Sequence, residues 1–394
     1  MGLLQKIKRY LPIRSESFYK RCSQMELRLQ AFQEETAANH RETLNALASL
    51  EQGLQHTISK LGTLQSDFRL FHALAISRQA YFIRETLPFF LQDDTIEEYD
   101  TRLQSPGKGP EIPVVFITDS QYLIPAMTAA SSLLRHAEEK DFHYTVHIIG
   151  CGLTREQIEP YAEISPRVYF HLENKDYTSL TKEHAWVSPA ALLKFDIPNL
   201  FPEYDKLLYL DSDMLVYENL VPLWKENIES FYAAVVKDLA GMVFEHHHEK
   251  MGHKNYFNTG MMLLNLKKMR QDNITERLFE AKKNDPWKHF MDQDVFNQVF
   301  QENVLYTSPR YNLMLANLYK FNVSPSMAAH FYSISLKEMK EILNTPAIQH
   351  LSNLDKPWFS TTGIDYENWH RENACLNRIL ERRNSRQHKK ENVL

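Results

Sequence analysis

Two aspartates one residue apart, Asp211 and Asp213, follow a short apolar run and are followed at once by further apolar residues. The run, residues 206–210, is too short for a stable helix and is typical of a buried strand. Residues i and i+2 of an extended backbone point to the same side, so both carboxylates can face one point just past the strand. Two unpaired carboxylates there would repel each other and cost free energy to desolvate. A divalent cation resolves both problems, and carboxylate oxygens suit magnesium or manganese.

The alternative is a turn at the end of a strand with two hydrated acids, which needs no metal. A lone Asp-x-Asp is common by chance, so the choice depends on the elements around it. Those elements alternate between strand-like and helix-like patterns, which predicts an α/β domain with a mostly parallel sheet. We expect strands at 112–117, 144–149 and 168–172, and helices at 123–136 and from residue 154. Ligands of such sheets bind at the carboxyl ends of the strands, where Asp119 and the aspartate pair both stand.

Four further stretches carry polar groups that could join this site. Residues 188–200 read as a helix that carries Lys194. An apolar strand at 256–266 is opened by a polar turn, Asn258-Thr259-Gly260. Residues 292–297 begin a helix whose acids lie near its N-terminus, where the helix dipole favours them. A loop at 350–358 places a histidine and a lysine six residues apart.

Five motifs in this order give the chain a family resemblance. They are Val115-Phe116-Ile117-Thr118-Asp119, Leu208-Tyr209-Leu210-Asp211-Ser212-Asp213, Phe257-Asn258-Thr259-Gly260, Asp292-Gln293-Asp294, and His350 followed by Lys356-Pro357-Trp358. Over residues 112–360 the sequence resembles glycosyltransferase family 8, the glycogenin-like enzymes that include bacterial lipopolysaccharide galactosyl- and glucosyltransferases. The resemblance implies a GT-A fold, a nucleotide-sugar donor that is usually a UDP-hexose, a manganese ion, and retention of anomeric configuration.

The resemblance also implies roles for individual residues. Asp211, Asp213 and His350 match three metal ligands, and two carboxylates with one imidazole fit manganese better than magnesium. Asp119 matches the acid that reads the uracil edge. Lys356 matches a lysine on the diphosphate. The positions implied to bind the donor and its metal are Ile117, Thr118, Asp119, Lys194, Asp211, Ser212, Asp213, Asn258, Thr259, Asp292, Gln293, His350, Asn353 and Lys356.

Among these positions, we expect Asp292, Gln293 and Lys356 to take part in catalysis. Asn258 and Asp292 match residues that hold donor-sugar hydroxyls, and Gln293 matches the residue beneath the anomeric carbon. The chain departs from the family pattern at two of the positions. Lys194 stands where the family usually has an arginine, and keeps the charge without the planar fork. Asn353 replaces a glycine of the loop after the histidine.

Composition limits the remaining possibilities. The formal charge is −5, but residues 1–20 and 378–394 are both basic, with five basic residues against one acid and six against two. An acidic body with basic ends does not resemble a nucleic-acid binder, and suits peripheral contact with an anionic membrane surface. No apolar stretch approaches the roughly 20 residues of a membrane span. Three scattered cysteines and a start without a signal-like apolar region favour the cytoplasm.

The residues before the linker at 105–110 have a different pattern. Large apolar side chains recur in steps of three and four at Leu47, Leu50, Leu54, Leu61, Leu64, Phe68 and Phe71, interrupted by Thr57. This stripe predicts a coiled coil through which the protein forms homo-oligomers; the alternative is an arm folded back on its own catalytic domain. A second helix is expected at 74–90, ending before the acidic stretch 93–100. We therefore divide the chain into a helical region at 1–104, a catalytic domain at 111–360 and a helical basic tail at 361–394.

The sequence favours a metal-dependent retaining glycosyltransferase that moves a hexose from a UDP-sugar to a hydroxyl acceptor, a cell-surface glycan or lipopolysaccharide. Two alternatives stay open at this stage: a haloacid-dehalogenase-type phosphatase, whose motif also begins Asp-x-Asp, and a catalytically impaired transferase that works through its coiled coil. Two smaller features are also undecided. Asp238 either faces the acceptor or caps a strand at 232–236. The histidines at 246–248 and His253 are expected to lie on a hydrated loop.

Overall fold

The computed structural model describes residues 93–136, 141–175, 177–181, 188–239, 255–284, 291–352, 356–359 and 365–391, together with position 24. For residues 93, 181 and 386–391 only the backbone is described. The chain separates into two units, Met1–Phe82 and Ile83–Leu394, and all described residues except position 24 belong to the second. The expected coiled coil, the helix at 74–90, the histidines at 246–248 and Asn353 lie outside the described residues.

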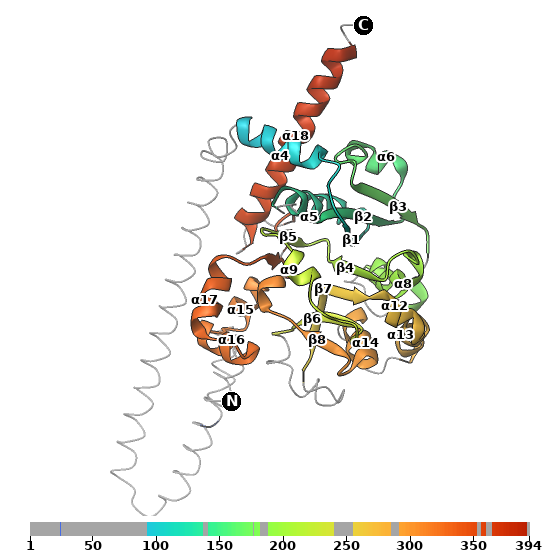
Figure 1. Ribbon diagram of the computed structural model, residues 1–394, viewed down its shortest axis with the longest axis vertical. Coiled ribbons are helices and arrows are strands. Elements are labelled where there is room, and N and C mark those ends of the chain that lie inside the picture. Colours follow the sequence, from blue (N-terminus) through green and yellow to red (C-terminus); the bar gives the residue numbers. More distant parts are fainter. Residues whose placement is uncertain are drawn as a thin grey trace, which may run out of the picture. The chain divides into compact units, whose positions relative to one another are not determined.

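A seven-stranded sheet with the order β3-β2-β1-β4-β7-β6-β8 forms the centre of the second unit (Figure 1). Its strands are β1 (Glu111–Thr118), β2 (His143–Cys151), β3 (Val168–Glu173), β4 (Lys206–Leu210), β6 (Ala233–Lys237), β7 (Phe257–Asn265) and β8 (Val304–Tyr306). Only β7 runs antiparallel to its neighbours, so the predicted α/β fold with a mostly parallel sheet is confirmed. The short strands β5 (Met214–Val216) and β9 (Ile348–His350) form a separate antiparallel pair.

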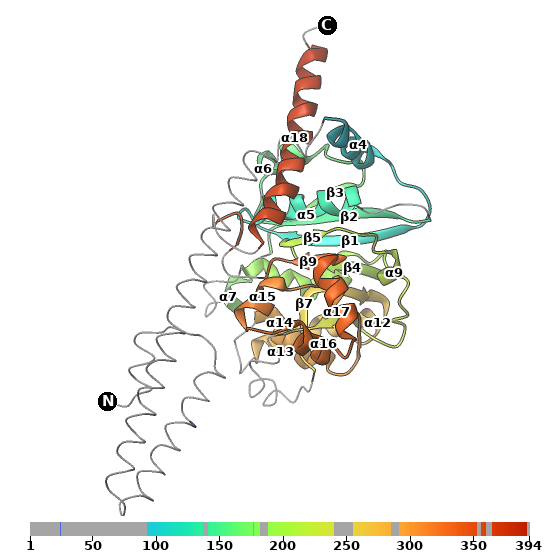
Figure 2. The same cartoon turned by 90° about the vertical axis from the view of Figure 1, so that its left-hand side faces the viewer.

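The sheet is covered on both faces because the side chains of its strands alternate between two hydrophobic cores. In β1, Val114 and Phe116 pack with helix α5 (Leu123–His136), and Val115 packs on the other face with the helix α14 (Met291–Phe300). This period of two places a buried side chain on each side of a central strand. Figure 2 shows α5 with α18 (Tyr366–Glu391) on one side of the molecule, and α13 (Ile274–Lys283) with α14 on the other.

The remaining helical segments of the described residues are short. They are α6 (Arg155–Ile158), η1 (Glu159–Tyr161), α7 (Thr178–Thr181), η2 (Pro189–Asp196), α8 (Ile197–Leu200), α9 (Val221–Trp224), α12 (Leu266–Gln271), η3 (Pro309–Tyr311), α15 (Leu315–Lys320), α16 (Pro325–Tyr332) and α17 (Leu336–Asn344). The predicted helix at 188–200 is in fact the 3-10 segment η2 followed by α8. Pro198 explains part of this break, because it offers no N–H to a preceding turn.

The acidic stretch after position 92 was expected to follow a helix, but it is a helix itself, α4 (Asp93–Gln104). Ile96 and Leu103 lie one above the other on its buried face and join the core with α5 and α18. The side chain of Asp100 is also buried and accepts a hydrogen bond of 2.7 Å from Arg383 Nε of α18. Burial on one face and this ion pair therefore hold the acidic stretch in a helix that packs on the body of the domain.

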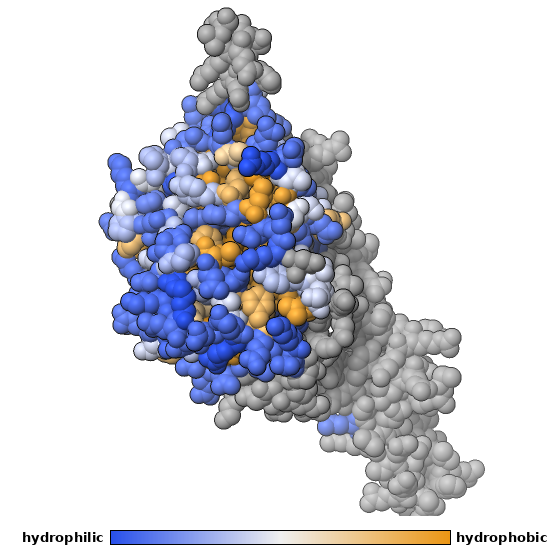
Figure 3. Space-filling view, turned by 90° about the vertical axis from the view of Figure 1, so that its right-hand side faces the viewer, coloured by the Kyte–Doolittle hydropathy of each residue, from blue (hydrophilic) through white to orange (hydrophobic). Residues whose placement is uncertain are grey.

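No helix among the described residues is long and apolar enough to cross a membrane. In Figure 3, hydrophilic side chains predominate among the coloured residues, and apolar ones gather in small separate groups. The large apolar side chains that are exposed include Tyr319, Met327 and Phe359.

Candidate active site

Four strands meet where the two predicted aspartates lie. The acidic residues form the connection between β4 and β5, and β4 pairs with β7 so that Leu210 is opposite Met261. The Asp211 amide continues this pairing and donates to the Gly260 carbonyl at 2.7 Å. On the other side, Met214 of β5 is opposite His350, the last residue of β9. Antiparallel β7 thus brings its own beginning, rather than its end, to the carboxyl end of β4.

This arrangement corrects two expectations. Asn258, Thr259 and Gly260 do not form a turn before the strand but lie within β7, because β4 and β6 supply hydrogen-bonding partners on both sides. His350 was expected in a loop and is instead held in β9. Both changes place these residues on rigid strands beside the acidic pair.

Asp211, Asp213 and His350 come together as predicted. Each offers one ligand atom, and these atoms lie within 4.8 Å of one another. His350 Nε2 is 3.3 Å from Asp213 Oδ1 and 4.0 Å from Asp211 Oδ2. His350 and Asp213 are buried, and Asp211 is partly exposed, so one side of the group remains accessible. Two carboxylates and an imidazole are a suitable ligand set for manganese.

The other imidazole nitrogen is already engaged, which leaves Nε2 for a metal. His350 Nδ1 lies 2.9 Å from Asn312 Oδ1, and the amide oxygen of Asn312 accepts the Nδ1 proton. A metal-ligating histidine commonly donates its second N–H in this way. Gly260 makes room for the ring, because a Cβ at this position would lie 2.5 Å from His350 Cε1. The residues present therefore fit a divalent metal.

Two lysines neutralise the acids of the site. Lys356 Nζ is 2.5 Å from Asp213 Oδ2 and also donates to the Leu351 carbonyl at 2.7 Å. Buried Lys194 bridges Asp211 Oδ1 at 3.0 Å and Asp292 Oδ2 at 2.8 Å. Burial alone would raise the pKa of Asp213, but the charges of Lys356 and His350 outweigh this effect and lower it. Burial alone would lower the pKa of Lys194, but the charges of the two carboxylates outweigh this effect and raise it.

A hydrogen-bond network fixes the polar residues of β7 and α14. Gln293 Oε1 accepts from Asn258 Nδ2 at 3.0 Å and from the Thr259 amide at 3.2 Å. Gln293 Nε2 donates to Asp238 Oδ2 at 2.9 Å, and Asn258 Nδ2 donates to the same oxygen at 3.1 Å. Thr259 Oγ1 donates to Asp292 Oδ2 at 3.1 Å. These side chains are all buried, so the network holds them in one orientation.

The end of β1 lies beside the acidic turn. Ser212 Oγ donates to the Ile117 carbonyl at 2.7 Å and so joins the turn to β1. Asp119 Oδ1 accepts the backbone N–H groups of Gln121 and Tyr122 at 3.0 and 3.2 Å, which fixes this carboxylate at the start of α5. Thr118 Oγ1 donates to the Asp119 carbonyl at 3.1 Å.

Sequence reasoning missed several residues of this site. Tyr209, expected only to pack, donates its hydroxyl to Asp211 Oδ1 at 2.6 Å. Asp238, left undecided between two other roles, holds Asn258 and Gln293. Asn312 was not identified, and no periodic pattern or motif around it points to the site. Tyr209 had a signal, since it stands two residues before Asp211 where β4 ends and so points to the same side.

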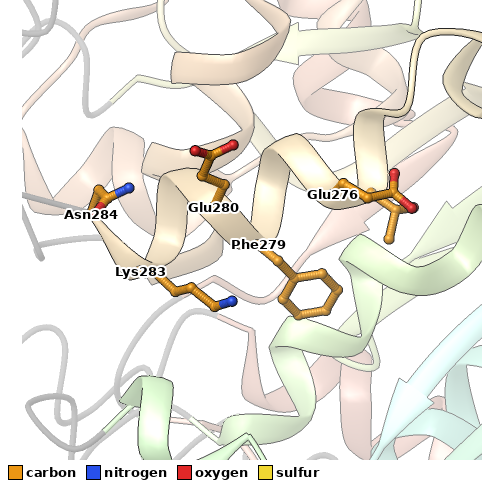
Figure 4. A pocket seen from close by; sticks show the side chains of 6 residues that line it. Glu276, Phe279, Glu280, Lys283 and Asn284 are labelled. Carbon is orange, nitrogen blue, oxygen red and sulfur yellow. The ribbon is translucent and has the colours of Figure 1, made fainter.

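A surface hollow lies elsewhere, along α13. It has a volume of about 690 Å³ and is lined by Thr275, Glu276, Phe279, Glu280, Lys283 and Asn284. Figure 4 shows Phe279 and Lys283 pointing to the same side of the helix. None of its lining residues belongs to the acidic site, and the hollow offers no group of three metal ligands among the described residues. We therefore do not assign the donor to it.

Comparisons with known proteins place this geometry in context. The model of glycosyl transferase family 8 matches residues 113–362. General stress protein A of Bacillus subtilis (strain 168) is 28% identical over 195 residues, which are 47% of this chain and 64% of that protein. Glycosyltransferase GlyF of Streptococcus pneumoniae serotype 4 (strain ATCC BAA-334 / TIGR4) is 26% identical over 251 residues, which are 62% of this chain and 56% of that protein. The match thus covers less than two thirds of either relative.

Among solved structures, the galactosyltransferase LgtC in complex with donor and acceptor sugar analogues superposes with a TM-score of 0.56. The two are 23% identical, and the alignment covers 67% of this chain and 95% of that one. This likeness establishes a shared fold, a mixed α/β sheet of the GT-A type.

Proposed function

The chain belongs to glycosyltransferase family 8 and is a glycosyltransferase, and from this premise we propose that it is a metal-dependent, retaining hexosyltransferase. The donor is a UDP-hexose, and the acceptor is a hydroxyl of a cell-surface glycan or lipopolysaccharide. One observation carries the proposal: two carboxylates and an imidazole lie within 4.8 Å of one another, beside Lys356.

Each end of the proposed donor has a partner in the site. One oxygen of Asp119 is held by two backbone N–H groups. The second, which has no hydrogen bond to a described residue, would accept the imide N–H of uracil. Lys356 offers a compact charge to the diphosphate. The family resemblance assigns the hexose to Asn258 and Asp292, and Lys194 holds the Asp292 carboxylate in place at 2.8 Å.

The metal would be held by Asp211, Asp213 and His350. When bound, it supplies Lewis-acid stabilisation to the departing diphosphate, worth several kcal/mol of barrier. In the overall reaction, the bond between the anomeric carbon and the β-phosphate oxygen breaks, and a bond to the acceptor oxygen forms. The acceptor proton passes to the phosphate oxygen that leaves. Lys356 stabilises the negative charge on that leaving group.

Gln293 is better suited to positioning than to nucleophilic attack. An amide oxygen is weakly basic, and this one already accepts two hydrogen bonds, from Asn258 and from the Thr259 amide. Its amide nitrogen is bound to Asp238. We therefore favour attack of the acceptor from the same face as the leaving group, without a covalent sugar on Gln293.

The phosphatase alternative is dropped, because the aspartate pair belongs to the family match and lies with His350 and Lys356. The location and assembly of the protein remain proposals. We propose a cytoplasmic enzyme that self-associates through the predicted coiled coil and contacts an anionic membrane through its basic ends. The basic residues at both ends support the membrane contact, since each contributes about 1 kcal/mol near such a surface.

A panel of nucleotide sugars tests the proposed donor. The enzyme is incubated with Mn²⁺ and UDP-glucose, UDP-galactose or other UDP- and GDP-sugars, and release of the nucleoside diphosphate is followed. We expect release with a UDP-hexose, and little with GDP-sugars. Release from GDP-sugars alone would contradict the assignment of Asp119 and the proposed donor class.

A further inference from the structure

We infer that Asn312 is a positioning residue that couples the metal ligand His350 to the donor-sugar contact Asn258. This inference rests on the proposed metal and donor. Asn312 follows η3, and its side chain is fully buried. Its amide oxygen lies 2.9 Å from His350 Nδ1, and its amide nitrogen donates to Asn258 Oδ1 at 2.9 Å.

The orientation of this bridge follows from a backbone group that can act only as a donor. The Gly260 N–H lies 2.9 Å from Asn258 Oδ1, so the oxygen of the Asn258 amide must face it. On its other side, Asn258 Nδ2 faces the carboxylate of Asp238, which accepts. The oxygen of Asn258 therefore requires a donor from Asn312, which turns the Asn312 oxygen towards His350.

The imidazole of His350 is the last group in this series of hydrogen bonds. An amide oxygen accepts only, so His350 must carry its proton on Nδ1. The lone pair on Nε2 then faces Asp211 and Asp213, where the metal would bind. Asn312 thus sets the tautomer of the histidine, and the same amide holds Asn258, which is bonded to Gln293. Metal binding and donor-sugar binding therefore both depend on the side chain of Asn312.

Two substitutions separate these functions. Asn312→Leu keeps a similar volume and removes both hydrogen bonds. Asn312→Asp keeps an acceptor for His350 but presents a second acceptor to Asn258 Oδ1. We expect the leucine variant to bind both the metal and the donor sugar more weakly. The aspartate variant should lose affinity only for the sugar part of the donor.

Metal binding is measured by electron paramagnetic resonance of Mn²⁺, with the purified full-length protein and with or without UDP. For Asn312→Leu we expect the Kd of Mn²⁺ to rise about 10- to 100-fold. For Asn312→Asp it should stay within about tenfold of wild type, as the histidine keeps its partner. Sugar binding is measured as the ratio of the Kd for UDP to the Kd for the UDP-hexose. This ratio should fall towards one in both variants.

Asn297→Leu is the matched control. Asn297 is also a buried asparagine with several hydrogen bonds, but they go to the backbone of Phe257 and Gln293. This variant should lower thermal stability and leave the Kd of Mn²⁺ unchanged. Wild-type Mn²⁺ affinity in Asn312→Leu, equal losses in both Asn312 variants, or an equal loss in Asn297→Leu would overturn the inference. Failure of the wild-type protein to bind Mn²⁺, with or without UDP, would instead overturn the proposed metal site and the inference with it.

Discussion

Gly260 is the position at which a single methyl group should do most damage to the metal site. A Cβ there would lie 2.5 Å from His350 Cε1 and 2.9 Å from both His350 Nδ1 and Asn258 Oδ1. Ordinary contacts begin at 3.4 Å, so in Gly260→Ala the ring must retreat by about 0.9 Å in a close-packed interior. The strand cannot move away freely, because the Gly260 carbonyl accepts the Asp211 amide at 2.7 Å. If the ring moves, His350 is displaced, and if the strand moves, Asp211 is displaced.

The expected size of the effect follows from this displacement. Overpacking costs about 1–3 kcal/mol of stability, which a domain of this size tolerates. A misplacement of about 1 Å in a reactive site costs about 100-fold in rate. We therefore expect a folded variant whose turnover falls by about two orders of magnitude. Its Kd for Mn²⁺ should rise as well, because His350 or Asp211 no longer faces the other ligands.

Turnover, Mn²⁺ affinity and thermal unfolding are measured side by side for Gly260→Ala and for Gly150→Ala. Gly150 is also in a strand, β2, and a Cβ there would lie 2.8 Å from Leu153 Cδ1, the end of a flexible side chain. The control should thus lose some stability but keep its Mn²⁺ affinity. If Gly260→Ala retains wild-type turnover and Mn²⁺ affinity, the close packing of His350 on β7 is not what shapes the site.

Three further predictions concern other parts of the chain. Gln293→Ala should reduce turnover and leave measurable activity, and mass spectrometry of the wild-type enzyme with donor should detect no hexose on Gln293; a covalent hexose there would refute front-face attack. Burial raises the pKa of Asp365 to about 6, so the folded state binds this proton more tightly than the unfolded chain. Between pH 4 and 7 the free energy of unfolding of the wild type should therefore fall by about 2 kcal/mol relative to that of Asp365→Asn; an equal difference between the two proteins in urea unfolding at both pH values would contradict this. Light scattering should find that the full chain is associated and that a chain beginning at residue 92, which retains α4, is monomeric. If both chains are monomers at micromolar concentration, the coiled-coil prediction is wrong.

The sequence predicted the strands of the site well where an apolar run ends in a polar group. The run before Asp211 and the one before Asp119 both end at the same edge of the sheet, since β1 and β4 are parallel and adjacent. Asp211 and Asp213 follow β4 at this edge, and the pairing of β5 with β9 brings His350 beside them. The positions of Asp119 and of the aspartate pair needed only local pattern and the rule that ligands bind at the carboxyl ends of parallel strands, whereas His350 was identified through the family resemblance.

The parts that the sequence did not predict depend on pairing between distant segments. Gly260 looked like a turn residue, and only antiparallel pairing with β4 makes it part of a strand. Asn312 has no local signal because both of its partners, His350 and Asn258, lie more than 35 residues away along the chain. The acidic α4 was misjudged since its helix is stabilised by contacts with α5 and α18 rather than by its own composition. Local patterns cannot encode contacts of this kind.

We propose that Asp211, Asp213 and His350 hold a metal on which sugar transfer depends. Asp213 is the most informative position, because its carboxylate lies beside both His350 Nε2 and Lys356 Nζ. The most direct test follows UDP release from a UDP-hexose by the wild-type enzyme and by Asp213→Ala, each with Mn²⁺ and with excess chelator, after circular dichroism has shown that the variant is folded. We expect release only by the wild-type enzyme with Mn²⁺. Full release in the presence of chelator, or by folded Asp213→Ala, would contradict it.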